Sequence, residues 1–395
     1  MKKAIIVMLG LAILIIGLAC GKAEQQPKQQ ITLSEAQAQA AKEGKPLLLD
    51  FYAEWCGPCK MFTKASHEDV DIMKALEGVV LHKIDCEKGE GIELAKKYEV
   101  RGYPTFIIVN ADLKQINRWM GYSKEYFLEN IAKTLSDLTP IEDKIARFGQ
   151  NPTLDDALAL AGYSDSKEDY KNAVIYFTKA AELDPNTNYS FKIFENTVGG
   201  TYNQDFTYDD AVIAAGKVFT SDNIDNQIQA AGSMAELAGY LNKLEDMAKY
   251  LEQGISLVDK TDNPEIKEYG KSLNVEYNLH VKADTTKAIE YQKSTYGDGW
   301  TEDANRLNSF SWWCYENGVN LEEAEQLATK AVGLSAPGSA KAMILDTVAH
   351  ICKARGNMAG AIKYMELAVK EDSTNSQWQE TLDGFKKEAE ETPAN

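Results

Sequence analysis

Two cysteines that could carry out redox chemistry, Cys56 and Cys59, are separated only by Gly57 and Pro58. An apolar run at 47–49 precedes them, and a helix-like pattern follows directly. A helix N-terminus stabilises a thiolate, which is the nucleophilic form of cysteine, through free backbone N–H groups and the helix dipole. The spacing therefore predicts a reactive dithiol at a junction between a strand and a helix.

The two cysteines are expected to have different roles. Cys56 would lie exposed at the helix mouth and attack the disulfide of a partner, and Cys59, one helical turn further in, would resolve the mixed disulfide. The alternative is half of a zinc site, which needs about four ligands. The sequence has no second Cys-x-x-Cys and no pair of histidines, so the redox interpretation is favoured.

The dithiol and its surroundings, roughly residues 33–138, resemble the thioredoxin family. Asp50 stands where that family keeps a buried carboxylate that handles the proton of the resolving cysteine, and Lys83 matches its usual lysine neighbour. The resemblance implies that Cys56, Cys59, Asp50 and Lys83 are the catalytic residues. It also implies that the redox-active disulfide is the only redox group, with no bound cofactor.

A second part of the resemblance concerns a substrate groove. Residues 101–105 match the loop whose proline is cis in the family, and the backbone before that proline pairs with substrate. Gly121 matches a glycine that leaves room for the substrate. The residues expected to bind substrate are Trp55, Gly57, Pro58, Tyr103, Pro104 and Gly121.

The charge of the chain is concentrated in its second part. The 395 residues carry a formal net charge of −18. Residues 21–139 hold 18 acidic and 16 basic side chains, whereas the residues after them hold 42 and 24. A nucleic-acid partner is therefore not expected, since it requires clustered lysine and arginine. The acidic excess is typical of a solvated helical surface and also suits basic partners.

The remaining cysteines and histidines form no recognisable site. The six cysteines are too few for a disulfide scaffold, and the four histidines have no partners at ligand spacing, so no metal site is predicted. Cys86 is interpreted as a small buried residue, with a regulatory thiol as the alternative. The positions are Cys20, Cys56, Cys59, Cys86, Cys314, Cys352, His67, His82, His280 and His350.

The N-terminus has the pattern of an export signal. Lys2 and Lys3 precede an apolar run at 4–19, which is short for a spanning helix, and Cys20 closes it. This resembles a bacterial lipoprotein signal, in which the cysteine becomes the lipidated first residue. Ordinary cleavage near residues 19–23 and an uncleaved anchor are the alternatives. Each places the mature chain on the periplasmic side of a membrane, since the lysines stay inside.

The pattern then divides the chain into domains. Residues 1–20 are interpreted as the signal, 21–31 as a polar tether, 32–139 as a thioredoxin-like domain and 140–395 as helical repeats. Within the second domain a βαβ unit followed by ββα predicts the α/β thioredoxin fold. Besides the helix after the dithiol, helices are expected at 35–43, 92–98 and 124–137. The first expected strand begins at Leu47, and three more are expected at 79–85, 105–109 and 115–119.

The segment after Pro140 contains alanine-rich helical patterns that repeat. Equivalent positions recur every 36 to 41 residues, and these units resemble tetratricopeptide repeats, whose usual period is ~34. We expect six helical hairpins that stack into an all-α solenoid, followed by a capping helix at 377–390. The equivalent positions are Ala173, Ala211, Met247, Ala288, Ala324 and Ala361.

The fifth repeat contains the aromatic residues that could serve binding, and the fifth and sixth repeats each contain a cysteine. Trp312, Trp313 and Tyr315 could anchor a peptide, although packing between helices also explains them. Cys314 and Cys352 each stand four residues before a glycine of a hairpin turn. Equivalent positions in neighbouring repeats usually lie about 9 Å apart, too far for a disulfide. Both are interpreted as small core residues.

These features lead to two functional hypotheses. The first is an exported thiol–disulfide oxidoreductase that reduces protein disulfides, with a membrane or thioredoxin-type electron donor and with repeats that bind a client or partner. The Gly57-Pro58 dipeptide resembles that of reducing thioredoxins. The second is a repeat-based binding scaffold or chaperone-like lipoprotein in which the redox activity is secondary.

Overall fold

The computed structural model describes residues 31–391, which form two compact units that divide between Pro140 and Ile141. The first unit contains a sheet and helices, and the second contains only helices among its described residues. The predicted order, an α/β domain followed by an all-α region, is confirmed. None of the helices within 31–391 has the length and hydrophobicity required to cross a membrane. The signal, Cys20 and most of the tether lie outside the described residues.

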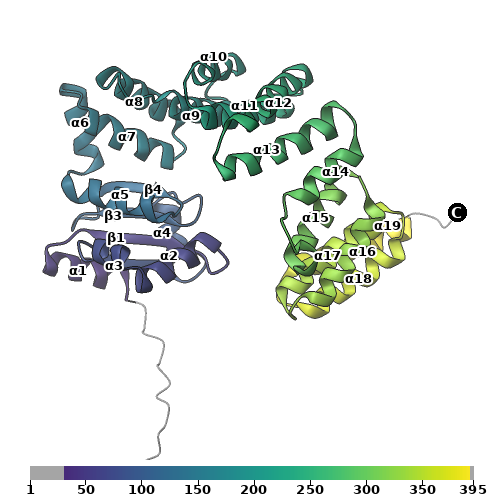
Figure 1. Ribbon diagram of the computed structural model, residues 1–395. Helices are drawn as coiled ribbons and strands as arrows, with labels where there is room; N and C mark the ends of the chain where they lie inside the picture. The colour runs from purple at the N-terminus through teal and green to yellow at the C-terminus, as the bar shows by residue number, and fades with distance from the viewer. Residues whose placement is uncertain (1–30, 392–395) are drawn as a thin grey trace, which may run out of the picture. The chain divides into compact units, whose positions relative to one another are not determined.

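The first unit is built on one mixed sheet of four strands in the order β2-β1-β3-β4 (Figure 1). β1 runs parallel to β2 and antiparallel to β3, and β4 is antiparallel to β3. The central strands β1 and β3 are almost completely buried, which explains why their sequences are apolar apart from Asp50 and Thr105. The strands are β1 (Leu47–Tyr52), β2 (Val80–Asp85), β3 (Thr105–Val109) and β4 (Gln115–Met120).

Helices cover both faces of this sheet. On one face α1 and α4 pack against Leu47, Leu49 and Ile107, and on the other face α2, α3 and α5 pack against Leu48 and Phe106. The helices are α1 (Leu33–Glu43), α2 (Gly57–Glu68), α3 (Val70–Leu76), α4 (Glu90–Lys97) and α5 (Lys124–Ser136).

The helix α3 is not anticipated by the sequence analysis. Asp69 ends α2 and begins α3, because its Oδ1 accepts hydrogen bonds from the N–H groups of Asp71 and Ile72 at 3.0 and 3.3 Å. Asp69 also pairs with Lys124 of α5 at 2.8 Å. One carboxylate thereby fixes the break between two helices and joins α3 to α5.

The second unit consists of six helical hairpins with a further helix at each end. The pairs are α7–α8, α9–α10, α11–α12, α13–α14, α15–α16 and α17–α18. The bounds are α6 (Ile141–Gln150), α7 (Leu154–Ser166), α8 (Tyr170–Leu183), α9 (Ser190–Tyr202), α10 (Tyr208–Phe219), α11 (Ile224–Tyr240), α12 (Leu244–Leu257), α13 (Pro264–Glu276), α14 (Thr285–Ser294), α15 (Ala304–Asn317), α16 (Leu321–Leu334), α17 (Ser339–Ala354), α18 (Met358–Glu371) and α19 (Ser376–Glu391). The six equivalent alanine or methionine positions are all buried.

The hairpins share one type of turn. The first helix of each pair is followed by a residue with positive φ: Glu168, Gln204, Asn242, Ala283, Gly318 and Gly356. In five of them the next N–H donates back to the carbonyl five residues earlier, which closes the helix. In the fourth, Asp284 reaches back six residues to Asn278, because a π-helical turn at Tyr277–Val281 inserts one residue.

The residues that accept the turn bonds of the five regular hairpins are small and buried, as the close contact between paired helices requires. They are Ser164, Gly200, Ala238, Cys314 and Cys352. The interpretation of Cys314 and Cys352 as small core residues is therefore confirmed. Burial raises the pKa of these thiols to about 12 and about 11, respectively.

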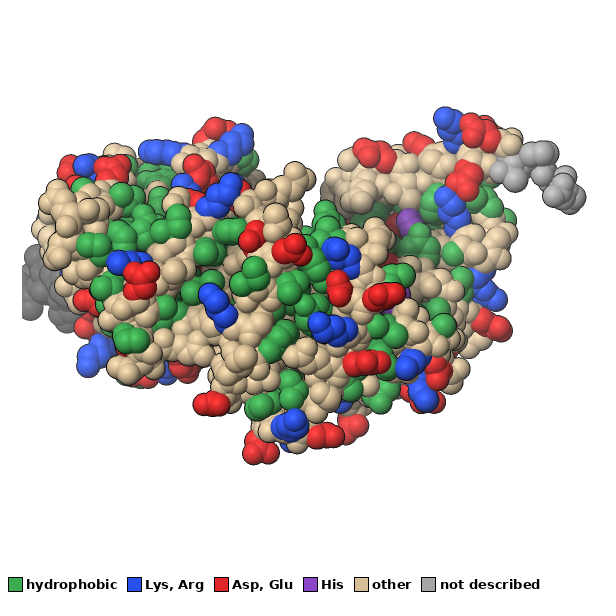
Figure 2. All heavy atoms as spheres, turned by 90° about the horizontal axis from the view of Figure 1, so that it is seen from above, with side chains coloured by type: hydrophobic (Ala, Val, Ile, Leu, Met, Phe, Trp, Pro, Cys, Tyr) green, Lys and Arg blue, Asp and Glu red, His purple; other side chains and the backbone are tan. Residues whose placement is uncertain are grey.

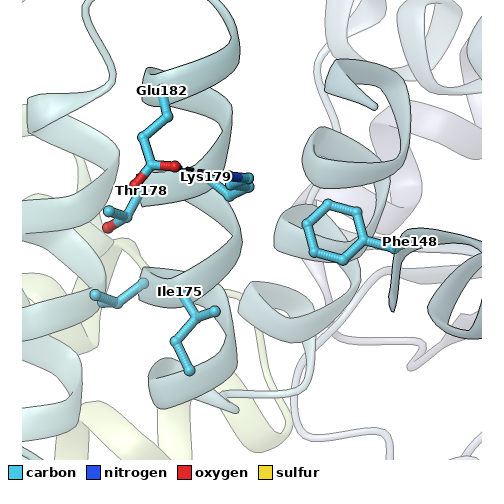
Figure 3. A pocket seen from close by; sticks show the side chains of 6 residues that line it. Phe148, Ile175, Thr178, Lys179 and Glu182 are labelled. Carbon is cyan, nitrogen blue, oxygen red and sulfur yellow. Dashed lines mark hydrogen bonds and ion pairs between the residues drawn. The ribbon is translucent and has the colours of Figure 1, made fainter. Parts of the chain in front are cut away.

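The surface is mixed in charge. On the face shown in Figure 2, acidic and basic side chains alternate, and hydrophobic side chains gather between them. An open pocket of about 400 Å³ lies between α6 and α8 (Figure 3). Its polar pair, Lys179 and Glu182, is joined at 2.7 Å. Because the rest of its lining is mostly apolar, with Phe148 and Ile175 prominent, the pocket offers no catalytic group.

Candidate active site

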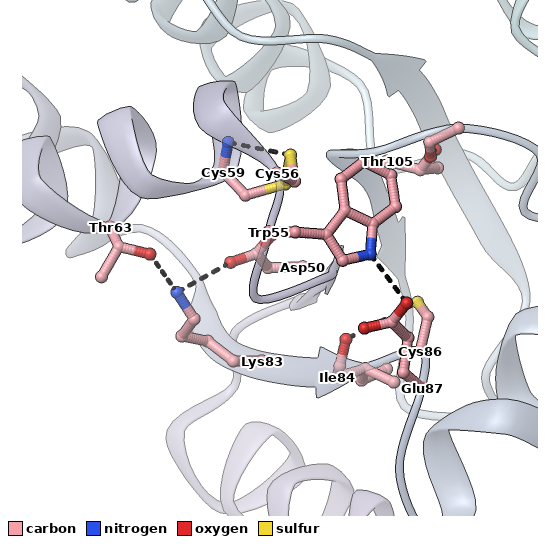
Figure 4. The surroundings of a disulfide bond; sticks show 11 residues. Asp50, Trp55, Cys56, Cys59, Thr63, Lys83, Ile84, Cys86, Glu87 and Thr105 are labelled. Atoms are coloured by element: carbon pink, nitrogen blue, oxygen red, sulfur yellow. Dashed lines mark hydrogen bonds and ion pairs between the residues drawn. A yellow bond between two sulfur atoms is a disulfide. The ribbon is translucent and has the colours of Figure 1, made fainter. Parts of the chain in front are cut away.

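The dithiol lies at the point where β1 passes into α2. Cys56 is the N-cap of α2, and its Sγ accepts a hydrogen bond from the N–H of Cys59 at 3.1 Å. The two cysteines are joined by a disulfide (Figure 4). Pro58 occupies the first turn of the helix, where a missing N–H costs nothing. The sequence of this short segment therefore places the sulfurs at the positive end of α2.

The expectation that Cys56 is exposed is wrong for the disulfide form. Both cysteines are only 3% exposed, and Ala53, Tyr52 and Tyr103 pack against them. The disulfide holds Cys56 against these side chains, which the spacing of the motif could not reveal. Gly57 and Pro58 are exposed, so the backbone between the cysteines is accessible.

A buried carboxylate lies beside the dithiol, as Figure 4 shows. Asp50, on β1, is 1% exposed, and its Oδ2 lies 3.4 Å from Nζ of Lys83. Lys83 comes from the adjacent position of the parallel strand β2. Burial raises the pKa of Asp50 to about 6, although the charge of Lys83 acts in the opposite direction. This carboxyl group can therefore accept or donate a proton near neutral pH.

Thr63 belongs to this group, although the sequence analysis does not single it out. Its Oγ1 accepts a hydrogen bond from Nζ of Lys83 at 2.6 Å, so Lys83 is held between Thr63 and Asp50 (Figure 4). Thr63 lies one helical turn after Cys59 on α2 and therefore on the same helix face. That i, i+4 spacing is the signal that could have identified it.

The tryptophan before the dithiol is held by a second unanticipated residue. Trp55 is 68% exposed, and its indole Nε1 donates to Oε1 of Glu87 at 2.7 Å. Its ring also meets the edge of Tyr103, with the centroids 5.9 Å apart. Glu87 follows β2, so only the parallel pairing of β1 and β2 brings it to Trp55. Nothing in the local sequence indicates this contact.

The expected proline loop lies beside the dithiol. The peptide bond between Tyr103 and Pro104 is cis, as the resemblance implies. The carbonyl of Pro104 accepts a hydrogen bond from the N–H of Gly121 at 2.8 Å. Gly121 has φ +85°, a conformation that favours glycine, and no atom lies within 4 Å of where a Cβ would be. The space expected at Gly121 is therefore present.

Comparison with known families gives one match in each unit. Residues 28–134 match the family model for thioredoxin, and residues 158–187 match the model for a tetratricopeptide repeat. The first unit is a thioredoxin-family domain. The fold and the order of domains expected from the sequence resemblance, thioredoxin followed by tetratricopeptide repeats, are confirmed.

Two curated proteins and one solved structure show what the chain is similar to. The thiol:disulfide interchange protein DsbD of Klebsiella pneumoniae is 40% identical over 78 residues, which cover 19% of this chain and 13% of that protein. Thioredoxin Y2 of Arabidopsis thaliana is 45% identical over 64 residues, 16% of this chain and 36% of that one. A solved thioredoxin from Thermus thermophilus is 27% identical with a TM-score of 0.24, and the match covers 26% of this chain and 82% of that one. The chain thus spans a small fraction of the length of the interchange proteins that it matches.

A third cysteine of the thioredoxin domain, Cys86, is not part of the dithiol. It directly follows β2 and is 7% exposed, and its Sγ lies 3.7 Å from the carbonyl oxygen of Ile84. Burial raises the pKa of its thiol to about 12. A thiol that stays protonated is a poor nucleophile, so this environment favours a structural role.

Figure 4 shows Asp50, Lys83 and Trp55 around the disulfide of Cys56 and Cys59. Of the other predicted substrate-binding residues, Tyr103 packs against the disulfide, and Gly121 is hydrogen-bonded to Pro104. Their individual roles stay predictions. The lipidation prediction for Cys20 lies outside the described residues. Within 31–391, no three His, Cys, Asp or Glu side chains are arranged to hold a metal ion.

Proposed function

We propose that the protein is an exported thiol–disulfide oxidoreductase that reduces disulfides of protein clients. The observation that carries the proposal is the Cys56–Cys59 disulfide at the N-terminus of α2, beside the buried Asp50. The similarity of this domain to thiol:disulfide interchange proteins and thioredoxins supports the reaction class.

The reaction begins from the reduced dithiol. The Cys56 thiolate attacks one sulfur of a client disulfide, a mixed disulfide forms, and the other client sulfur leaves as a thiolate. Asp50 takes the proton of Cys59, and the resulting thiolate attacks Sγ of Cys56. The second client sulfur leaves, and two electrons have passed from the dithiol to the client. The product is the Cys56–Cys59 disulfide, which is the form described above.

The direction of transfer depends on the reduction potential. The Gly57-Pro58 dipeptide resembles that of reducing thioredoxins, whose potential is about −270 mV, against about −120 mV for a strong periplasmic oxidant. We therefore expect a reductase. A membrane or thioredoxin-type donor would return two electrons to the disulfide after each cycle.

Reduction of insulin by the full-length chain with dithiothreitol tests the activity. We expect turnover for the natural protein and none for Cys56→Ser or Cys59→Ser, measured as precipitation of the insulin B chain. A Cys86→Ser variant is the matched control and should keep its rate. Equal rates for the natural protein and Cys56→Ser would rule out the proposed chemistry.

A second candidate function is a binding scaffold or chaperone-like protein in which redox activity is secondary. The tetratricopeptide match and the six hairpins favour it, because stacked hairpins form extended surfaces for partners. Tight client binding without insulin turnover would support this candidate over the first.

The proposed location is the periplasmic side of a membrane, with a lipid on Cys20. The two N-terminal lysines, the apolar run and Cys20 support this proposal. We expect Cys20→Ser to release the protein from membranes, measured by fractionation and by the mobility of the processed chain. An equally membrane-bound, unprocessed variant would instead indicate an uncleaved anchor.

A further inference from the structure

The fifth and sixth hairpins place a group of aromatic and polar side chains at matching positions. The turn bonds from Val319 to Cys314 and from Asn357 to Cys352 are equivalent, and aligning them shows which positions of α15 and α17 correspond. In this register Asn308 matches Asp346, Trp312 matches His350 and Tyr315 matches Lys353. We call Asn308, Trp312, Tyr315, Asp346 and His350 the aromatic platform.

The rings of the platform contact one another between helices. The Trp312 and Tyr315 centroids lie 5.0 Å apart, and His350 lies 5.7 Å from Trp312 and 5.4 Å from Tyr315. On its other side His350 contacts Phe385 of α19 at 5.3 Å. Trp312 and Tyr315 are partly exposed, so part of each ring is available to a ligand.

The platform contains three hydrogen-bond acceptors that lack a good partner. Oδ1 of Asn308 and Nδ1 of His350 are buried and make no hydrogen bond. The side chain of Asp346 is 16% exposed, and its Oδ1 lies 3.8 Å from that same Nδ1, which is too long for a hydrogen bond. Burial lowers the pKa of His350, so the ring is neutral and Nδ1 can accept when the proton is on Nε2.

Three carboxylates on α16 and α19 differ from Asp346, because each has a cationic partner. Glu323 lies 2.7 Å from Lys293, Glu388 lies 2.5 Å from Lys353, and Glu325 pairs with Arg355. No lysine or arginine in residues 31–391 lies within 4.0 Å of the Asp346 carboxylate. Burial without such a partner raises the pKa of Asp346 to about 6.

We propose that the aromatic platform binds an arginine side chain of a partner protein. The guanidinium would stack on Trp312 and Tyr315 and donate to Asp346, Asn308 and His350. This inference names the partner chemistry of the repeats, whose binding role is part of the proposed function.

Arginine fits this site for chemical reasons. A guanidinium has five N–H donors and no acceptor, and the platform offers it the Asp346 carboxylate, Oδ1 of Asn308 and, with the ring proton on Nε2, Nδ1 of His350. Its planar, weakly hydrated cation stacks on aromatic faces better than the ammonium of lysine does. The excess of acidic over basic residues after residue 139, 42 against 24, also favours a basic partner.

Peptide binding to the full-length protein tests this assignment. The probe is a blocked, fluorescein-labelled Gly-Ser peptide that contains two arginines, and matched peptides contain two lysines, two citrullines or two glutamates. Fluorescence polarisation at pH 7.5 gives each affinity. We expect the order arginine, lysine, citrulline, with no binding of the glutamate peptide. Equal affinity for arginine and citrulline, or no arginine binding, would overturn the proposal.

Asp346→Asn is the decisive variant, because it removes the charge and keeps the shape. We expect it to weaken the affinity for the arginine peptide about tenfold, which is the effect of losing one close ion pair. Glu366→Gln, on the exposed face of α18, is the control and should change the affinity less than twofold. An unchanged affinity in Asp346→Asn would overturn the proposal. Trp312→Phe provides a second check and should reduce arginine binding more than lysine binding.

The pH dependence offers an independent readout. The titratable groups near His350 are Lys353 on the same helix, which is paired with Glu388 of α19, and Tyr315 on α15. Arginine binding should therefore weaken as the pH falls from 7.5 to 5 in the natural protein, while Asp346→Asn shows little change. Peptide binding by Cys56→Ser should be normal. Loss of redox activity and loss of arginine binding are thereby distinguishable.

Discussion

At the scale of single residues, the site depends on a carboxylate, Asp50, whose burial makes its charged form unfavourable in the folded state. Asp50 is 1% exposed, and its pKa is raised to about 6 by burial despite Lys83 at 3.4 Å. The same property that lets it accept a proton near neutral pH also destabilises the fold. Function and stability therefore respond oppositely to a change at Asp50.

Asp50→Asn should stabilise the protein and slow its reaction. Because the pKa of Asp50 is raised in the folded state, its stabilising contribution is complete below pH 4 and lost as the pH rises through 6. The variant should therefore gain up to roughly 2–3 kcal/mol above pH 7 and nothing below pH 4. Urea unfolding at several pH values measures this difference. A variant less stable than the natural protein at pH 8 would contradict it.

The Asp50 variant should slow resolution more than attack. The carboxylate takes the proton of Cys59, whereas the nucleophilic attack uses the Cys56 thiolate. Stopped-flow measurement of mixed-disulfide formation and decay separates the two steps. Equal slowing of both would assign Asp50 a different role.

Trapping experiments should distinguish the roles of Cys56 and Cys59. Cys59→Ser should accumulate mixed disulfides with clients through Cys56, because no thiol remains to release them. Cys56→Ser should trap nothing. Non-reducing gels of the purified variants after incubation with oxidised clients measure both. Trapping by Cys56→Ser alone would reverse the assigned roles.

At the scale of helices and strands, patterns within one element were predictable and contacts between elements were not. The apolar run of β1, the helix after the dithiol and the six hairpins follow from local composition. Thr63 and Glu87 were missed because their partners lie on β2 and before α2, respectively. The burial of Cys56 depends on Tyr103, which is distant in sequence. Six ends of helices or strands in the thioredoxin domain differ from the predicted ends by one or two residues.

The break between α2 and α3 gives a prediction at this scale. Asp69→Ala should cost about 1–2 kcal/mol, because the N-cap of α3 is lost and buried Ile72 is less firmly held. Asp71→Ala is the control, since Asp71 also pairs with Lys124, at 2.7 Å, but caps no helix. Its cost should stay below about 0.5 kcal/mol. Equal losses in thermal unfolding would assign the effect to the ion pairs.

At the scale of the whole molecule, each hairpin depends on its neighbour. Phe310 and Cys314 of α15 share a buried cluster with Leu345 and Val348 of α17 and with Leu382 of α19. The thioredoxin domain has its own separate clusters. A truncation or substitution that destabilises one unit is therefore expected to leave the stability of the other unchanged.

Truncation after Leu334 should destabilise α15 and α16 while leaving the thioredoxin domain folded. The deletion exposes the cluster around Phe310, which is completely buried in the full chain. Circular dichroism should show a greater loss of helix than the deleted residues account for, and insulin reduction should persist. Truncation after Asp372, which removes only α19, should have a smaller effect. Loss of insulin reduction together with helix loss would show that the units depend on each other.

The buried thiols have a practical consequence. Within residues 31–391, Cys86, Cys314 and Cys352 are all buried, and burial raises the pKa of each. A thiol reagent applied to the native, oxidised protein should label none of them, and after reduction should label the dithiol first. The rate of slow labelling at Cys314 or Cys352 would then report the rate at which the fifth and sixth hairpins open transiently. These two cysteines are therefore natural probes of local unfolding in the repeats, and no label site has to be introduced.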